Sequence, residues 1–248
     1  MDYIKDIIYV NKESFFKTIK SLKTSWPIIF AGFAYGALSI VIVAVLNLLL
    51  SGPLSLLSGI ISILITSSLF SNYLYLLTNV LKYGRITFDD FKNGFTYYTR
   101  KIYSIIFVFY LARLILSLAV GMFGPGGGTI LSLVSLAAVI LLNALPETIY
   151  QKYYGPVDSI SYAFSFISEN ALNWAVPNII LLGALYPMVS SVFPIAFMIT
   201  FRVVPGITQI LAFLIGQLLL NFGMIYRGHL FSLLSTSTKR KREYMKKF

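Results

Sequence analysis

The sequence contains no cysteine and a single histidine, His229. Without cysteine there is no disulfide, no thiolate metal ligand and no cysteine nucleophile, and one histidine cannot build a multi-histidine metal centre. Charged residues make up only 12% of the 248 residues, whereas a soluble domain carries roughly 25%. So little charge cannot cover a globule in water. Together with a hydrophobic fraction of 57%, it indicates an integral membrane protein.

Acidic residues are the scarcer charged type, with nine Asp and Glu against 20 Lys and Arg. The sequence has no G-x-S-x-G motif, no phosphate-binding Walker loop and no pair of carboxylates within an apolar run. We therefore expect neither an enzyme nor a cofactor. A net charge of +11 would suggest nucleic-acid binding in a soluble protein, but here membrane orientation accounts for it, and we expect no nucleic-acid partner.

Six mostly apolar runs are each long enough to cross a bilayer, which takes about 20 helical residues. They cover residues 26–50, 54–81, 102–123, 129–150, 174–201 and 207–226. We expect six helices, because backbone amides in lipid must be bonded within their own segment. The first run follows about 25 polar and mixed residues, so it is expected to be retained rather than cleaved as a signal peptide. Pro177, Pro187 and Pro194 are expected to kink the fifth span.

Segments rich in proline and glycine join the runs in pairs, at residues 51–53, 124–128 and 202–206. Such clusters are typical of turns, so the spans form three hairpins. The glycine-rich segment 124–128 also resembles a phosphate-binding loop, but it lacks the lysine that such a loop requires. A plain turn is the preferred interpretation.

Each hairpin follows a segment with the apolar period of an amphipathic helix. The first of these contains Ile4, Ile8 and Phe15, the second opens on a capping box formed by Thr87 and Asp90, and the third opens on Pro156. We expect these helices to lie in the cytoplasmic interface of the membrane. The alternative is that they pack on a partner or on each other.

The hairpins leave the membrane through similar sequences, each with an aromatic residue, a basic residue and a glycine. The glycines Gly84, Gly155 and Gly228 are 71 and 73 residues apart. A near-constant period is typical of duplicated units. The fold class predicted is therefore an all-α, six-helix membrane protein with a possible pseudo-threefold internal repeat. It is one membrane domain, 1–248, with repeats 1–84, 85–155 and 156–228 and a basic tail, 229–248.

The basic residues predict which side faces the cytoplasm. Eighteen of the 20 lie in the segments on one side of the spans, so the positive-inside rule places both termini in the cytoplasm of a multi-pass plasma-membrane protein. The tail ends in a basic cluster that is either simply solvated or a contact for anionic lipid. Its members are Lys239, Arg240, Lys241, Arg242, Lys246 and Lys247.

Polar residues inside the spans are the candidate functional groups. Arg113 lies near the middle of the third span and must be paired or wet, while Asn143 and Glu147 share one face of the fourth span. They predict either a polar cavity open to the cytoplasm or a clamp holding the second hairpin together. Asn72, Asn143 and Gln217 fall at similar depths, and Asn221 shares a face with Gln217. These amides predict either helix–helix bonds or a shared substrate path.

The sequence also resembles a loose group of uncharacterised prokaryotic membrane proteins, which includes the membrane domain fused to some glycerophosphodiester phosphodiesterases. The resemblance rests on Asp90-Phe91-Lys92-Asn93-Gly94-Phe95, on Leu145-Pro146-Glu147 and on Ala163-Phe164-Ser165-Phe166-Ile167. It implies an all-helical membrane fold. It implies no activity, and the phosphodiesterase domain itself is absent.

Two functions fit these patterns. The first is a small permease or the membrane subunit of a transport or export system, because a mid-span arginine, a proline-rich span and an internal repeat recur in transporters. The second is a non-transporting membrane scaffold or membrane-shaping protein that binds anionic lipid or a cytoplasmic partner through its interfacial helices and basic tail. A homo-oligomer is also possible, because Gly32 and Gly36 form a small-residue face.

Overall fold

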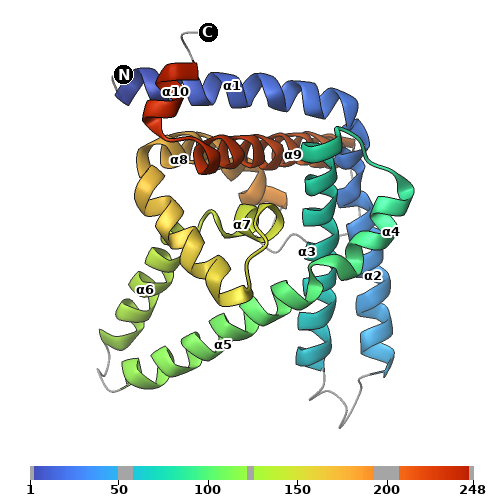
Figure 1. The fold of residues 1–248 in the computed structure, drawn as a ribbon. Coiled ribbons are helices and arrows are strands. Elements are labelled where there is room, and N and C mark those ends of the chain that lie inside the picture. The colour runs from blue at the N-terminus through green and yellow to red at the C-terminus, as the bar shows by residue number, and fades with distance from the viewer. Residues whose placement is uncertain (1–2, 50–57, 122–125, 193–206, 246–248) are drawn as a thin grey trace.

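The structure is a computed structural model that describes residues 3–49, 58–121, 126–192 and 207–245, and all regular elements in these ranges are helical (Figure 1). In chain order they are α1 (Tyr3–Thr24), the 3-10 helix η1 (Trp26–Phe30), α2 (Ala31–Leu49), α3 (Ser58–Tyr83), α4 (Phe88–Tyr97), α5 (Thr99–Gly121), α6 (Gly127–Leu141), α7 (Leu145–Gln151), α8 (Pro156–Val192), α9 (Ile207–Thr236) and α10 (Lys239–Met245).

Three helical stretches are long and apolar enough to cross a membrane: Trp26–Leu48, Ser58–Tyr83 and Thr99–Gly121. A fourth forms if α6 and α7, which meet at a bend of 41°, are one broken span. These stretches confirm a helical protein with several potential membrane spans. They do not confirm six spans. The end of the predicted fifth span, 193–201, lies outside the described residues, and α9 packs along α1 across one end of the molecule (Figure 1).

The boundaries of the predicted amphipathic helices agree with the structure. Asp90 and Thr87 form the capping box at the start of α4, where the Thr87 hydroxyl accepts from the Asp90 amide and the Asp90 carboxylate accepts from the Thr87 amide. Helix α8 begins at Pro156 and breaks at Asn170, whose φ and ψ are not helical. The amide nitrogen of the Asn170 side chain donates to the Phe166 carbonyl (3.1 Å). The break separates the third amphipathic helix from the segment that starts at Trp174.

The break in α8 is at Asn170 and not at the prolines that were predicted to kink the fifth span. The backbone is helical at Pro177 and Pro187, and Pro194 lies outside the described residues.

Helix α1 turns a narrow face of mainly small polar residues toward α9. The buried positions on it are Asp6, Val10, Ser14 and Thr18, which recur every four residues and so form one stripe. Small side chains in such a stripe allow two helix backbones to approach closely. The larger apolar residues expected to share a face, Ile4, Ile8 and Phe15, remain exposed instead.

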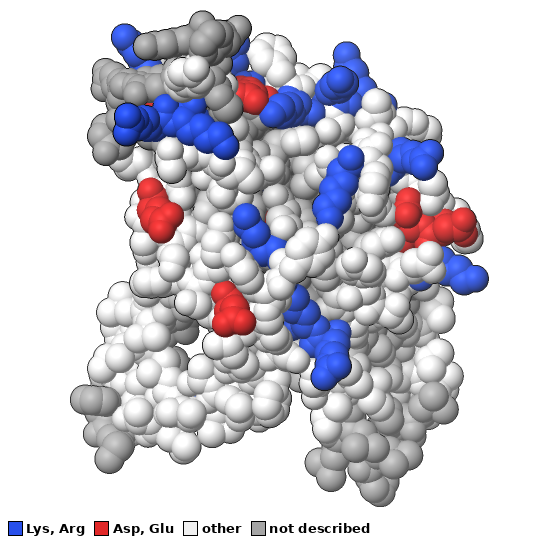
Figure 2. Space-filling model, in the orientation of Figure 1, with Lys and Arg blue, Asp and Glu red and all other residues white. Residues whose placement is uncertain are grey.

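Charge is distributed unevenly over the molecule. In Figure 2 the basic and acidic side chains lie over the end that contains α1 and α10 and over the middle of the molecule, while the described surface at the opposite end, where α2, α3, α5 and α6 terminate, is white. Helix α1 begins and α10 ends at the charged end (Figure 1). This pattern fits hairpins that enter a membrane from the charged end.

Gly127, the first residue of α6, provides a test of how α6 packs on the end of α5. A Cβ at Gly127 would overlap the Val120 carbonyl oxygen and lie 2.7 Å from the Val120 Cγ1, whereas a Cβ at the adjacent Gly128 would meet nothing within 4 Å. We expect Gly127→Ala to destabilise the protein by about 1–3 kcal/mol through overpacking. Gly128→Ala is the matched control and should be neutral or slightly stabilising, because alanine favours the helix.

The measurement is the thermal unfolding midpoint of the two purified variants in the same detergent. Equal midpoints for Gly127→Ala and Gly128→Ala would contradict the close packing of α6 on the end of α5.

Candidate functional site

A largely buried ion pair joins α7 to α9. The Arg227 Nε donates to the Glu147 Oε1 at 2.7 Å, and the Arg227 Nη2 donates to the Glu147 Oε2 at 2.9 Å. The Glu147 side chain is 0% exposed and that of Arg227 14%. This parallel two-bond geometry is the strongest arrangement of an arginine and a carboxylate. It compensates much of the cost of removing both charges from water.

Two further residues complete this cluster. The Arg227 Nη2 also donates to the Asn143 carbonyl at 2.6 Å, and the guanidinium lies over the Trp174 ring, with its Cζ 5.2 Å from the ring centroid. The Trp174 Nε1 in turn donates to the Asn143 Oδ1 at 3.0 Å. We call Asn143, Glu147, Trp174 and Arg227 the polar clamp. It ties the turn between α6 and α7 to α8 and α9.

The local sequence explains why the Asn143 carbonyl is free to accept. Helix α6 ends at Leu141 and α7 starts at Leu145, with Pro146 in its first turn. Proline lacks an amide hydrogen, which costs nothing at a helix start, where that hydrogen would have no partner. The Leu142 carbonyl is satisfied by the Leu145 amide (2.9 Å). The break therefore leaves the next carbonyl, that of Asn143, available to Arg227.

The predicted association of Arg113 with Asn143 and Glu147 is wrong. Within the described residues no hydrogen bond or ion pair joins Arg113 to either of them, and Arg113 is exposed on α5. Arg227, rather than Arg113, pairs with Glu147 because the two residues lie at a similar predicted depth in the membrane. Glu147 lies three residues before the end of the fourth predicted span and Arg227 one residue after the sixth, so both lie near the same membrane boundary. Arg113 lies 11 residues inside its span. A comparison of how far each charged residue lies from that membrane boundary would have identified Arg227 as the partner of Glu147 from the sequence.

The amides predicted to share one depth have separate partners. The Asn72 Oδ1 accepts from the Tyr35 hydroxyl at 2.6 Å, and its amide nitrogen donates to the Phe91 carbonyl, so Asn72 joins α2, α3 and α4. The Asn221 Oδ1 accepts from the Tyr73 hydroxyl at 3.1 Å. Buried Gln217 lies against Gly32 of α2. Among the described residues, no hydrogen bond links Asn72, Asn143 and Gln217 to one another, and the bonds of Asn72 and Asn143 join different helical elements.

A second buried ion pair holds the C-terminal helix. Arg242 of α10 donates to both carboxylate oxygens of Asp6 in α1, at 2.9 and 2.7 Å, and the two side chains are 3% and 1% exposed. Arg242 also donates to the Ser237 carbonyl (2.5 Å), and Asn173 of α8 donates to Asp6 (3.2 Å).

The prediction that Arg242 contacts lipid is therefore wrong, because the buried Asp6 carboxylate requires its charge. Arg240 and Lys241 of the same cluster are exposed. The Lys239 side chain and both Lys246 and Lys247 lie outside the described residues.

His229 also joins α1 to α9. Its Nε2 lies 2.9 Å from the Ser21 hydroxyl. Burial lowers the pKa of His229 to about 4, with a smaller contribution from Lys17. The imidazole is thus neutral at physiological pH, and its role there is a hydrogen bond between helices.

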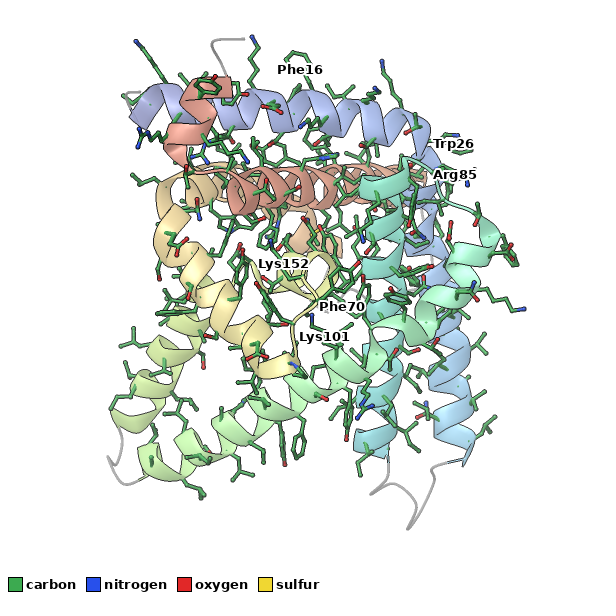
Figure 3. The ribbon with its side chains drawn as sticks, in the orientation of Figure 1. Phe16, Trp26, Phe70, Arg85, Lys101 and Lys152 are labelled. Atoms are coloured by element: carbon green, nitrogen blue, oxygen red, sulfur yellow. The ribbon has the colours of Figure 1, made fainter. Side chains whose placement is uncertain are left out.

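The lysines near the end of α7 also have structural partners (Figure 3). Lys101 of α5 donates to the carbonyls of Ile149 and Lys152, at 3.1 and 3.2 Å. Lysine at a helix C-terminus satisfies carbonyls that have no amide partner in the helix. The Lys152 Nζ itself lies 5.3 Å from the Tyr162 ring centroid. Both residues therefore fix the end of α7 as well as contributing to the charge of this side.

The described residues contain no group of three or more His, Asp or Glu side chains placed to hold a metal ion. Taken together, the fold and its polar clamp define a helical protein with three or four potential membrane spans and a bonded polar interior. No protein-family model, no curated protein and no solved structure matches the sequence. The resemblance to the membrane domain of certain phosphodiesterases stays a prediction.

Removing one member of the buried pair should be far more damaging than removing both. Glu147→Leu or Arg227→Leu alone leaves an uncompensated buried charge, which costs about 3–5 kcal/mol. The double variant Glu147→Leu/Arg227→Leu replaces the pair by apolar groups and should recover most of that loss. The measurement is a double-mutant cycle of unfolding free energies in detergent. Additive single losses would show that the pair is not coupled.

Proposed function

We propose that this protein is a non-transporting membrane scaffold that binds anionic lipid at its cytoplasmic face through α1. The observation that carries the proposal is the exposed side of α1. Ile4 is 64%, Ile8 59% and Phe15 44% exposed, although large apolar side chains in a helix that packs on the protein would normally turn inward. A lipid surface is the environment that covers them.

The order of side chains around α1 supports this orientation. At 100° per residue, the buried stripe beginning at Asp6 is followed by the stripe of Ile4, Ile8 and Phe15 and then by Lys5 and Lys12. All five lysines of α1 are exposed. Apolar residues flanked by lysines are typical of a helix that lies in the headgroup region, where each basic residue near an anionic surface contributes about 1 kcal/mol.

Exposed aromatic residues continue this surface beyond α1. Trp26 is 57% and Phe30 50% exposed, and in Figure 3 Trp26 extends outward at the corner between α1 and α2. Tryptophan is enriched at the boundary between hydrocarbon and headgroups. The corner therefore marks the level at which the first span would enter the membrane.

The alternative, transport, has less support. Its candidate path depended on Asn143 and Glu147, but their side chains and the Asn143 carbonyl are bonded to Trp174 and Arg227. Breaking these bonds to pass a substrate would leave a buried charge unpaired. In favour of transport, the bend between α6 and α7 resembles the broken helices of transporters. A clamp nevertheless accounts for all of these contacts.

We also propose that both termini lie in the cytoplasm and that the chain consists of three repeats, although the sixth predicted span, within α9, packs along α1. The helix order supports the repeat, since an amphipathic helix precedes two longer apolar segments three times: at α1, at α4 and at the first part of α8. The third unit differs, because Gly84 ends α3 with a φ of 64° whereas Gly228 lies inside α9.

The absence of cysteine makes this topology directly testable. Gly126 lies in the turn predicted to face outward, and a Cβ there meets nothing within 4 Å. We expect Gly126→Cys in intact cells to react with a membrane-impermeant maleimide, and Lys241→Cys to react only after the cells are opened. Reaction of Gly126→Cys from the inside alone would overturn the orientation.

Quenching of tryptophan fluorescence by brominated lipid tests the lipid-binding function. Trp174 is 2% exposed, so quenching should come mainly from Trp26, and Trp26→Phe should remove most of it. In nanodiscs of mixed lipid, brominated phosphatidylglycerol should quench more strongly than brominated phosphatidylcholine at the same fraction. The triple variant Lys5→Gln/Lys12→Gln/Lys23→Gln should abolish that difference.

The matched control is Arg240→Gln/Lys241→Gln, which removes exposed charge from α10 and leaves α1 unchanged. It should retain the preference for phosphatidylglycerol. Equal quenching by the two lipids in the unmodified protein would refute the proposed function.

A further inference from the structure

We propose that the middle of α5 binds a membrane-spanning helix of a partner protein, and that this partner helix carries a carboxylate that pairs with Arg113. This goes beyond the scaffold function, which concerns α1 and lipid. It rests on the position of Arg113 within an apolar helix and on where the chain's own carboxylates are.

The face of α5 that contains Arg113 faces the protein near both ends of the helix. Ile102 and Ile106 precede Arg113 by eleven and seven residues and Val120 follows it by seven, so all four lie on one side. Ile102 and Val120 are 3% and 7% exposed, and Ile106 packs against the core. Arg113 itself is exposed. The middle of an inward face is therefore uncovered.

The surroundings of Arg113 are apolar. One turn before Arg113, Phe109 is 37% and Tyr110 57% exposed, and the adjacent Leu114 is 42% exposed. Only 11% of the most apolar stretch of α5 is buried, against 44% in α3. An arginine among such side chains in a membrane is strongly unfavourable unless a counter-charge or water meets it.

This chain does not supply that counter-charge among its described residues. Glu147 and Asp6 are committed to the two buried pairs, and Glu13 pairs with Lys17. Asp89 and Asp90 start α4, and Asp158 and Glu169 lie on the first part of α8. Asp89, Asp90, Asp158 and Glu169 lie outside the potential spans, and Glu147, which lies in the broken span, already pairs with Arg227. Among the described residues, a second copy of the chain therefore offers Arg113 no free acid at the same depth. Charge complementarity therefore points to a different, acidic helix.

A lipid phosphate is a poorer partner for reasons of reach. Arg113 lies fourteen residues from Thr99, about 21 Å along the helix axis. Its side chain points back toward that end of α5, so its guanidinium remains among apolar side chains. A carboxylate in the middle of an adjacent helix would lie at the depth of the Arg113 guanidinium, and the pair would shield both charges from lipid.

The probe is a synthetic leucine-rich membrane-spanning helix with one central Glu, compared with otherwise identical helices carrying Gln or Leu there. The protein and a labelled helix are reconstituted together in vesicles, and association is measured by resonance energy transfer. We expect the Glu helix to bind at least tenfold more tightly than the Leu helix, with the Gln helix between them. Arg113→Leu should abolish the preference, and Arg113→Lys should keep part of it.

Ile115→Ala is the matched control, because Ile115 is 66% exposed on the same helix and carries no charge. It should leave the preference for Glu unchanged. Equal binding of the Glu and Leu helices to the unmodified protein overturns the proposal. So does energy transfer between copies of the protein that depends on Arg113 when no Glu helix binds, since a second copy would then cover this face.

Discussion

The buried ion pair between Glu147 and Arg227 is the constraint on which the arrangement of the helices depends. A carboxylate with no exposure needs a cation, so α9 must pass α7 at the level where Arg227 meets Glu147. That register brings Asn221 to Tyr73 and places Gly228 against Leu81 and Tyr150. Trp174 and Asn143 then add α8 and the turn after α6 to the same contact.

The same rule explains the unusual orientation of α1. Asp6 is buried and needs Arg242, which brings α10 back onto the start of the chain. Ser14, Thr18 and Ser21 follow Asp6 around the helix toward α9, where Ser21 meets His229. The Asp6–Arg242 ion pair and the Ser21–His229 hydrogen bond therefore hold the two ends of the polar face of α1. The apolar side of α1 is left outward because the inward side is occupied by the residues that hold α9 and α10.

What the sequence could predict was local. Apolar runs predicted the helices, the Thr87 and Asp90 pattern predicted a capping box, and Pro156 marked the start of α8, because each depends on neighbours in the chain. The partner of Glu147 could not be predicted in this way, since Arg227 is 80 residues away and served equally well as a topology signal. Arg242 was misassigned for the same reason. A basic residue in a cluster of basic residues gives no local sign that one of them is buried.

The two buried ion pairs also help to interpret the exposed Arg113. The chain has few acidic residues, and the two buried carboxylates among the described residues, Glu147 and Asp6, are each paired with an arginine. Arg113, which lies in the apolar helix α5 without a carboxylate partner among the described residues, therefore departs from the pattern of Arg227 and Arg242. The interior shows that burial of charge in this fold goes with a two-bond partner. By that standard the contact surface of the second hairpin is completed by a group from outside the chain.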